Sequence, residues 1–230
     1  MKQSAASIKK RRLDWESECR RSGFGVVIGV DEAGRGPLAG PVVAGAAAVL
    51  DFNASGESFG YLLENVADSK KLSGPKRREV YDVLIASKNI VWGCGRVGPK
   101  IIDKINILEA TKVAMSLAIA CLVAKLPPSH GAIFCLLDGN FQIGVEYPQE
   151  SIIKGDQKIF SISAASIIAK VSRDRMMERL DKKYPDYGFA RHKGYPTREH
   201  VNCLARLGLL PEHRKSFGPC AGLLGKAIIK

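Results

Sequence analysis

Four acidic residues follow three short apolar runs of strand length: Asp31, Glu32, Asp138 and Asp156. Strand ends in an open α/β sheet gather around a common crevice, so these side chains are expected to converge although they lie far apart in the chain. Converging carboxylates repel one another, and hard divalent cations such as Mg²⁺ or Mn²⁺ neutralise them. An aspartate after a strand is also a common turn residue. The joint occurrence at three strand ends is what predicts a metal site.

Metal ions held by carboxylates are suited to phosphodiester hydrolysis, because one ion activates the water and a second, roughly 3.5–4 Å away, stabilises the leaving oxygen. The chain has 35 Lys and Arg against 23 Asp and Glu, a net charge of +12. Residues 1–21 carry seven basic and three acidic side chains, residues 170–230 carry 14 and six, and residues 22–169 are neutral. This pattern indicates a polyanion held by the ends, although a basic surface that serves only solubility is equally compatible with it.

The elements that position these residues follow from apolar periodicity and capping residues. Strands are expected at 25–30, 41–50, 89–92, 132–137 and around 152–153, and helices at 75–87, 106–126 and 161–183. Asn106 and Glu109 form a capping box, and the helix that they open is expected to be largely buried. Residues 51–59 are interpreted as a polar turn. The alternation predicts an α/β fold with a mixed central sheet flanked by helices.

The sequence argues against a dinucleotide-binding site, a membrane span, a secretory signal and a zinc site. The run at 93–98 fits GxGxxG, but Pro99 follows at once, so no helix is expected there and the run is interpreted as a glycine-rich strand. The uncharged apolar stretch at 113–124 is shorter than the roughly 18 residues that a bilayer requires. Residues 1–21 lack the apolar core of a secretory signal. The six cysteines form no CxxC pair and no zinc spacing, which predicts free thiols in the cytoplasm.

The segment DEAGRGPLAGPVV at 31–43 resembles the first motif of the ribonuclease HII family, the type 2 ribonucleases H. Further matches follow in the expected order: DSKKLS at 68–73, IDKINIL at 102–108, LDGN at 137–140, KGD at 154–156, SAASIIAKVSRDR at 163–175, GYPT at 194–197 and HRKSF at 213–217. About 20 residues precede the first strand, which leaves no room for the N-terminal substrate-binding domain of type 3 ribonucleases H. Matched site residues, unlike a shared fold alone, license a functional expectation.

The resemblance implies a ribonuclease H-like fold with four metal-site carboxylates, which fall on the acidic residues found above at the strand ends. Asp174 is the rival of Asp156 for the fourth place. The KGD match favours Asp156, and Asp174 is expected to pair with neighbouring arginines. The cofactor implied is Mn²⁺ or Mg²⁺, with two ions during catalysis.

The resemblance also implies that the Gly34, Arg35 and Gly36 backbone, with Tyr195, senses the junction where a ribonucleotide precedes a deoxyribonucleotide. Glycines let the main chain approach a 2′-OH, and an aromatic ring can stack on the adjoining deoxy sugar or base. Taken alone, the glycines would be interpreted as a tight turn and the tyrosine as a loop aromatic packed on the core. Three lysines are candidate phosphate contacts, with a solvated side chain equally compatible for each: Lys70, Lys71 and Lys170.

The implied activity is that of an endoribonuclease that hydrolyses the RNA strand of RNA–DNA hybrids and cuts 5′ to single ribonucleotides in duplex DNA, leaving 3′-OH and 5′-phosphate ends. It is expected to act as a cytoplasmic monomer without a membrane partner. A DNA nuclease of the same fold and a non-catalytic basic RNA-binding protein remain open. The expected organisation is a basic extension at 1–22 that is flexible or one helix, a catalytic domain at 23–195, and a small helical C-terminal segment at 196–230 packed on the same domain.

Overall fold

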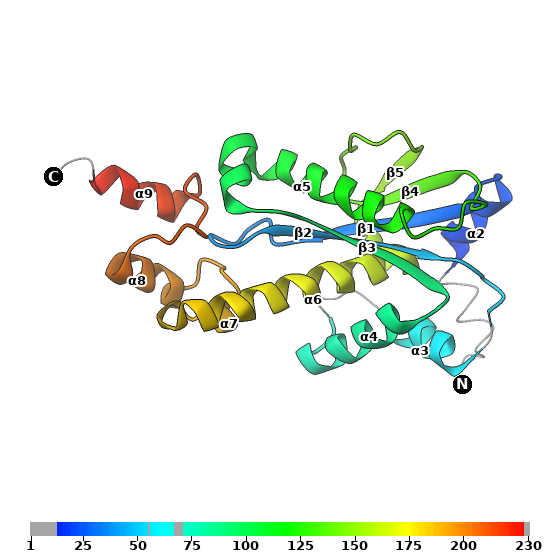
Figure 1. The fold of residues 1–230 in the computed structure, drawn as a ribbon, viewed down its shortest axis with the longest axis horizontal. Coiled ribbons are helices and arrows are strands. Elements are labelled where there is room, and N and C mark those ends of the chain that lie inside the picture. The colour runs from blue at the N-terminus through cyan, green and yellow to red at the C-terminus, as the bar shows by residue number, and fades with distance from the viewer. Residues whose placement is uncertain (1–12, 55, 67–70, 228–230) are drawn as a thin grey trace.

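The computed structural model describes residues 13–54, 56–66 and 71–227 and has a five-stranded mixed sheet at its centre. The strands are β1 (Val26–Ala33), β2 (Val42–Val49), β3 (Ile90–Val97), β4 (Ile133–Asp138) and β5 (Gln149–Ile152), in the order β3-β2-β1-β4-β5. The central strand β1 pairs antiparallel with β2 and parallel with β4. Helices cover both faces of the sheet (Figure 1), which confirms the predicted fold class.

Two long helices lie on opposite faces of the sheet (Figure 1). The helices of these two layers are α5 (Pro99–Val123) on one face and α6 (Phe160–Lys183), α3 (Glu57–Asn65) and α4 (Gly74–Ala86) on the other. Alternate residues of β1 divide between the layers: Ile28 and Val30 belong to the α5 core, whereas Val27 and Gly29 contact α6. Because side chains alternate along a strand, Asp31 is directed to the α6 side.

The glycine-rich run at 93–98 is a strand against which α5 packs closely. A Cβ at Gly93 would lie 2.1 Å from the carbonyl oxygen of Ala118, and a Cβ at Gly95 would lie 2.1 Å from that of Ala114, so a larger residue leaves no room for the helix. The interpretation of this run as a strand is confirmed. The expectation that no helix follows it is wrong: α5 begins at Pro99, whose fixed φ suits the first turn of a helix.

α5 is interrupted at Asn106, where the backbone φ is 67°. Asn106 Oδ1 accepts hydrogen bonds from the N–H groups of Leu108 (2.9 Å) and Glu109 (3.1 Å), which confirms Asn106 as a cap. The Glu109 side chain pairs with Lys112 (2.8 Å), and helical residues also precede Asn106. The helix is less buried than expected, because Val113 and Leu117 are 42% and 47% exposed. By length and composition α5 would suffice to cross a bilayer, but its other side packs on β2 and β3 as a core helix.

The N-terminal half of the chain contains two helices in addition to the elements predicted above, α2 (Asp14–Arg21) and α3. The polar turn expected at 51–59 is wrong from Glu57 onward, where α3 begins and buries Phe59 and Leu62. The N-terminal extension contains helix α2 (Asp14–Arg21). Its Glu16 is fully buried, and Glu16 Oε1 accepts a hydrogen bond (2.8 Å) from the N–H of Ser161 at the start of α6. The extension therefore caps a core helix.

The last helices gather at one end of the molecule (Figure 1): α7 (Phe189–His192), α8 (Arg198–Leu207) and α9 (Gly218–Ala227). They enclose a small apolar core that includes Leu38, from the loop after β1, and Phe189. The C-terminal segment therefore supports the loop that leaves the central strand. All six cysteines are free, as predicted. The division into segments 1–22, 23–195 and 196–230 stays a prediction.

Candidate active site

Three aspartates from separate segments converge at one end of the sheet. Asp31 lies in β1, Asp138 is the last residue of β4, and Asp156 lies in the short 3-10 helix η1 (Gly155–Gln157) that follows β5. One carboxylate oxygen of each lies within 4.8 Å of the other two. The structure thus brings together three of the four carboxylates that the sequence singles out, and their role in catalysis stays a prediction.

Strand pairing explains this convergence. β1 and β4 are parallel neighbours with Val30 opposite Leu137, so the residues that follow, Asp31 and Asp138, lie side by side. The N–H of Gly155 donates to Asp138 Oδ1 (2.7 Å), which holds the start of η1 against β4 and places the next residue beside the pair. A Cβ at Gly155 would lie 2.6 Å from Ile162 Cδ1 of α6, so a larger residue there would require the end of the Ile162 side chain to move.

The electrostatics of the three aspartates fit a divalent cation. Asp31 and Asp156 are buried, at 4% and 3% exposed. Burial, followed by the negative charges of Glu32 and Asp138, raises the pKa of Asp31 well above its ordinary value. A cation among these oxygens would remove the repulsion and favour the ionised form. The donors are all carboxylate oxygens, the set that Mg²⁺ and Mn²⁺ prefer, so the residues present fit the metal that the sequence predicts.

Glu32 is the fourth predicted carboxylate, and it is not one of the three whose oxygens converge within that distance. Successive side chains of a strand point to opposite faces, so Glu32 is directed away from the side that Asp31 faces. Its Oε1 lies 3.5 Å from Arg35 Nη1, an ion pair inside the predicted recognition loop. Its charge nevertheless raises the pKa of Asp31. Glu32 therefore interacts both with the aspartate cluster, through its charge, and with the loop that follows β1, through Arg35.

Two glycines of that loop differ in what surrounds them. Gly34 has a φ of +99°, and a Cβ there would lie 2.1 Å from Arg173 Nε. Gly36 is exposed, and a Cβ there would meet only Tyr195 Cε1, at an ordinary 3.8 Å. The fold therefore explains a glycine at position 34. At position 36 the fold would also accept a larger residue, and the space that its side chain would occupy is open to solvent beside the Tyr195 ring.

Tyr195 is 42% exposed, and its backbone is held by buried histidines. His200 Nδ1 lies 3.0 Å from the Tyr195 carbonyl oxygen, and His200 Nε2 lies 3.1 Å from His213 Nε2. His213 Nδ1 accepts from the N–H of Leu210 (2.8 Å), so its Nε2 carries the proton that is donated to His200. Burial, with the neighbouring His200, lowers the pKa of His213 to about 4. A chain of neutral imidazoles thus fixes the backbone beneath an exposed ring.

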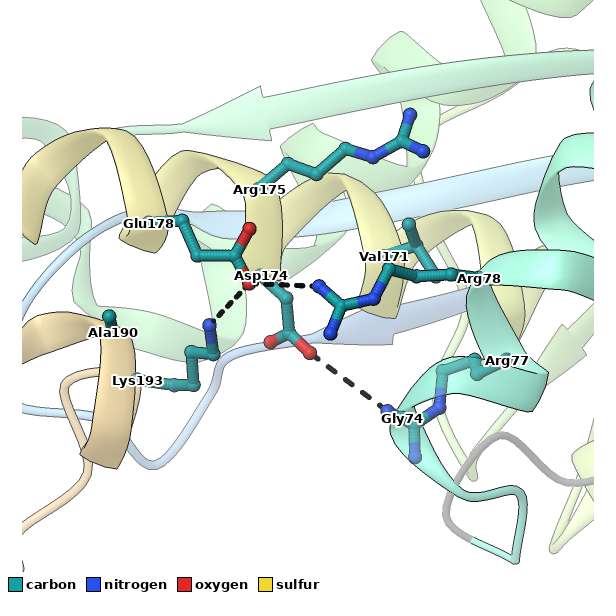
Figure 2. Close-up of a pocket in the computed structure, with 9 residues that line it drawn as sticks. All are labelled: Gly74, Arg77, Arg78, Val171, Asp174, Arg175, Glu178, Ala190 and Lys193. Carbon is teal, nitrogen blue, oxygen red and sulfur yellow. Dashed lines mark hydrogen bonds and ion pairs between the residues drawn. The ribbon is translucent and has the colours of Figure 1, made fainter.

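Asp174, the rival fourth ligand, lies in a different pocket that none of the three converging aspartates lines (Figure 2). Its carboxylate accepts from Lys170 Nζ (2.7 Å) and lies 3.9 Å from the Arg77 guanidinium. Asp174 thus pairs with an arginine, as expected, but the arginine is Arg77 of α4 and not a neighbour in the sequence. Arg173 reaches the loop after β1, and Arg175 pairs with an aspartate of α4. Asp174 is thus an ion-pair residue between α6 and α4.

The three lysines named as phosphate contacts are placed differently. Lys70 lies outside the described residues. Lys71 is exposed in the turn before α4. Lys170, on α6, is bonded to Asp174. Their contact with phosphate stays a prediction.

Arg173 and Arg214 lie in the matched motifs, and the sequence does not predict that either of them binds the loop after β1. Both are fully buried, and both donate hydrogen bonds to the backbone of the loop after β1. No signal in a single sequence marks them, because arginine is an ordinary surface residue and its burial depends on segments that are distant in the chain.

The mixed sheet and the helices on its two faces place the chain in the ribonuclease H fold class. Ribonuclease H2 of Pyrococcus horikoshii OT3 has a similar structure, with a TM-score of 0.67 and 28% identity over 89% of this chain and 100% of that one. Bst ribonuclease HIII in complex with Mn²⁺ shares the fold, with a TM-score of 0.70 and 18% identity over 89% of this chain and 71% of that one.

Sequence similarity narrows the class to one family. The family model described as ribonuclease HII matches residues 28–220. Ribonuclease HII of Bacillus cytotoxicus is 47% identical over 210 residues, which cover 91% of this chain and 75% of that protein. Ribonuclease HII of Acetivibrio thermocellus is 48% identical over 203 residues, or 88% and 73% of the two chains. The chain belongs to the ribonuclease HII family, whose members are metal-dependent endonucleases that act on RNA–DNA substrates.

Proposed function

We propose that this ribonuclease H cuts the RNA strand of RNA–DNA hybrids and also cuts immediately 5′ to a single ribonucleotide in duplex DNA, leaving 3′-OH and 5′-phosphate ends. The observation that carries the proposal is the convergence of Asp31, Asp138 and Asp156 within 4.8 Å beside an exposed glycine loop. A protein that only bound RNA would gain nothing from such a cluster, because three carboxylates repel phosphate when no cation is bound.

The proposed metal ligands are the four carboxylates predicted from the sequence: Asp31, Glu32, Asp138 and Asp156. Two Mg²⁺ or Mn²⁺ ions bound there would supply an activated water and stabilise the leaving 3′ oxygen. The chain's own contribution is to fix the ligands before substrate arrives. Asp138 is held by the Gly155 N–H, and Asp31 accepts a hydrogen bond from the N–H of Glu32 (2.6 Å). The ligands are thereby preorganised on two parallel strands and on the 3-10 helix η1 that Asp138 binds.

The proposed recognition elements are Gly34, Arg35 and Gly36 with Tyr195. The open face at Gly36 lets the main chain come close to a 2′-OH, the one group that distinguishes a ribonucleotide from a deoxyribonucleotide there. The exposed Tyr195 ring lies beside it and can stack on the following deoxy nucleotide, where no hydroxyl obstructs the ring. The loop and the ring together would therefore read a junction rather than a base sequence.

Phosphates are proposed to be contacted by Lys70, Lys71 and Lys170. The basic ends of the chain would add affinity for the duplex that does not depend on sequence. We further propose that the enzyme acts as a monomer in the cytoplasm, where its six free cysteines stay reduced.

The test uses two DNA duplexes of one sequence that differ by a single 2′-OH. With Mg²⁺ or Mn²⁺ the protein is expected to cut the first once, 5′ to the ribonucleotide, and to leave the all-DNA duplex intact. Replacing Tyr195 with alanine should reduce this cleavage without removing the carboxylates. An Asp138→Asn preparation, purified in parallel, controls for a contaminating nuclease and should bind but not cut.

Other outcomes would contradict the proposal. Equal cutting of both duplexes would indicate a general DNA nuclease of the same fold. Tight binding of both with no cutting would indicate a binding protein. Full activity of Asp138→Asn at saturating Mn²⁺ would remove Asp138 from the site.

A further inference from the structure

Two fully buried arginines lie beneath the proposed recognition loop. Arg173, on α6, is 1% exposed, and Arg214, between α8 and α9, is 0% exposed. Among the described residues neither guanidinium forms an ion pair with a carboxylate. Buried arginines are normally paired, because an isolated charge is costly to remove from water. Their burial here therefore calls for a reason beyond packing.

Each of the two guanidinium groups donates three hydrogen bonds, and all six acceptors are backbone carbonyl oxygens. Arg214 donates to Gly34 (2.6 Å), Arg35 (2.9 Å) and Gly40 (3.0 Å). The rigid fork of one side chain thus binds carbonyl groups at the start and near the end of the loop. Lysine could supply the charge but not this planar set of donors.

Arg173 completes the arrangement from the other side of the loop. It donates to Pro41 (3.0 Å) and Ala39 (3.1 Å), and its third hydrogen bond goes to Lys193 (3.0 Å), two residues before Tyr195. Its guanidinium carbon lies 5.9 Å from the centre of the Tyr195 ring. One side chain therefore fixes the glycine loop and the tyrosine relative to each other.

We propose that Arg173 and Arg214 are positioning residues that determine the preference for a single ribonucleotide in DNA. The inference rests on the proposed function of the loop and of Tyr195. The two arginines act through the backbone and do not touch the substrate. Their task is to hold the hydroxyl-reading loop and the stacking ring at one fixed separation.

Peptide geometry shows how Arg214 would do this. In a planar trans peptide the C=O and the following N–H point in opposite directions. The carbonyl groups of Gly34 and Arg35 point inward to Arg214, so the N–H groups of Arg35 and Gly36 point outward. Both of these residues are exposed. Arg214 thereby presents two backbone donors toward the substrate, where a 2′ oxygen or a phosphate oxygen can accept.

A single ribonucleotide demands this accuracy more than a hybrid does. In an RNA–DNA hybrid every nucleotide of the cut strand carries a 2′-OH, so a displaced loop still finds a hydroxyl in a neighbouring register. A lone ribonucleotide offers one hydroxyl and one productive register. Loss of positioning should therefore reduce cleavage of the lone ribonucleotide much more than cleavage of the hybrid, whereas a general loss of folded protein reduces both equally.

The experiment compares kcat/KM on these two substrates for Arg214→Lys, Arg173→Lys and the wild type. Arg206→Lys, on the exposed surface of α8, is the matched control. Because a misplacement of about 1 Å can cost ~100-fold in rate, we expect a loss of about tenfold or more on the lone ribonucleotide, a loss under about threefold on the hybrid, and no change for the control. Thermal unfolding and single-turnover rates establish that the variants are folded and separate binding from cleavage.

Equal losses on both substrates would overturn the proposal and leave the arginines a purely structural role. Arginine variants that cut both substrates at the wild-type rates would overturn it as well. If the wild type itself does not cut at lone ribonucleotides, the proposed function fails instead, and the two failures are distinct.

A second measurement does not depend on folding of the arginine variants. Amide exchange at Arg35 and Gly36, followed by NMR in the Asp138→Asn protein, should be fast in the free protein. Both amides should become protected with the single-ribonucleotide duplex and not with the all-DNA duplex. Protection in the free protein, or none with the ribonucleotide duplex, would show that these N–H groups do not point at the substrate.

Discussion

Replacing Gly34 and Gly36 with alanine, one at a time, is expected to give opposite results, although the two residues share one loop. At Gly34 the added Cβ would lie 2.1 Å from Arg173 Nε and 2.9 Å from the Pro41 carbonyl oxygen. At Gly36 it would meet only Tyr195, at 3.8 Å. The first substitution should therefore damage the fold, and the second should damage only recognition of the substrate.

The magnitudes follow from these contacts. Alanine in the left-handed region costs about 1–2 kcal/mol. Displacing Arg173 would break at least one charged hydrogen bond, worth about 1.5–3 kcal/mol. Gly34→Ala should therefore lower the free energy of unfolding by roughly 3–5 kcal/mol. Gly36→Ala should leave it unchanged or raise it by about 0.4–1 kcal/mol, because alanine restricts the unfolded chain.

Urea unfolding measures the free energy of unfolding of both variants, and cleavage of the single-ribonucleotide duplex measures their recognition of the substrate. Gly36→Ala should unfold like the wild type and yet cut at least about tenfold more slowly, because a methyl group would stand where the main chain must approach the 2′-OH. A destabilised Gly36→Ala, or one that cuts at the wild-type rate, would refute the assignment of this open face to the substrate. A stable Gly34→Ala would refute the packing argument.

Three other substitutions test separate features. Asp156→Asn should reduce cleavage at least about 100-fold and Asp174→Asn far less, because only the first substitution removes a converging carboxylate. The reverse ranking in steady-state assays would assign the role of metal ligand to Asp174. The pKa of His213 is about 4 in the folded protein and 6.5 ordinarily. Between these two pH values the unfolded chain therefore binds more protons than the folded protein. Roughly 3 kcal/mol of stability that is present above pH 6.5 should be lost as the pH falls to 4. Urea unfolding of His213→Gln should show a weaker loss over that interval, and an identical loss would show that His213 is not the group responsible. Glu16→Ala should cost about 1 kcal/mol by removing the cap of α6, whereas Glu16→Gln keeps an acceptor; equal calorimetric stability of both would argue against capping.

The convergence of the three aspartates could be predicted from the sequence because each carboxylate is placed by its own segment. An apolar strand that ends in an acidic residue fixes both the direction of the strand and the location of the carboxylate. Parallel pairing of β1 with β4 then brings Asp31 and Asp138 together, as the α/β pattern predicts. The cap at Asn106 was predictable for the same reason, since it depends on residues within one turn.

The supports of the recognition loop could not be predicted. Arg173 and Arg214 are distinguished by what lies opposite them, and their acceptors are carbonyl groups that every residue possesses. The helix that begins at Pro99 differs from the expectation because proline, which breaks a helix interior, is favourable in the first helical turn. α3 was missed because its buried face, with Phe59 and Leu62, is short and follows a polar segment.

The hydrogen bond from Arg214 to Gly34 spans 180 residues, and this span has a consequence during synthesis. At about 5–20 residues per second, the ribosome delivers the loop roughly 10–40 s before the arginine that fixes its carbonyl groups. Asp31 is made just before the loop, and Asp138 and Asp156 are made within that interval. The nascent chain therefore contains all three aspartates before the arginine that binds the loop has been made. If Arg214 positions the loop as we propose, selectivity for a ribonucleotide is acquired only when the last part of the polypeptide folds back onto the first.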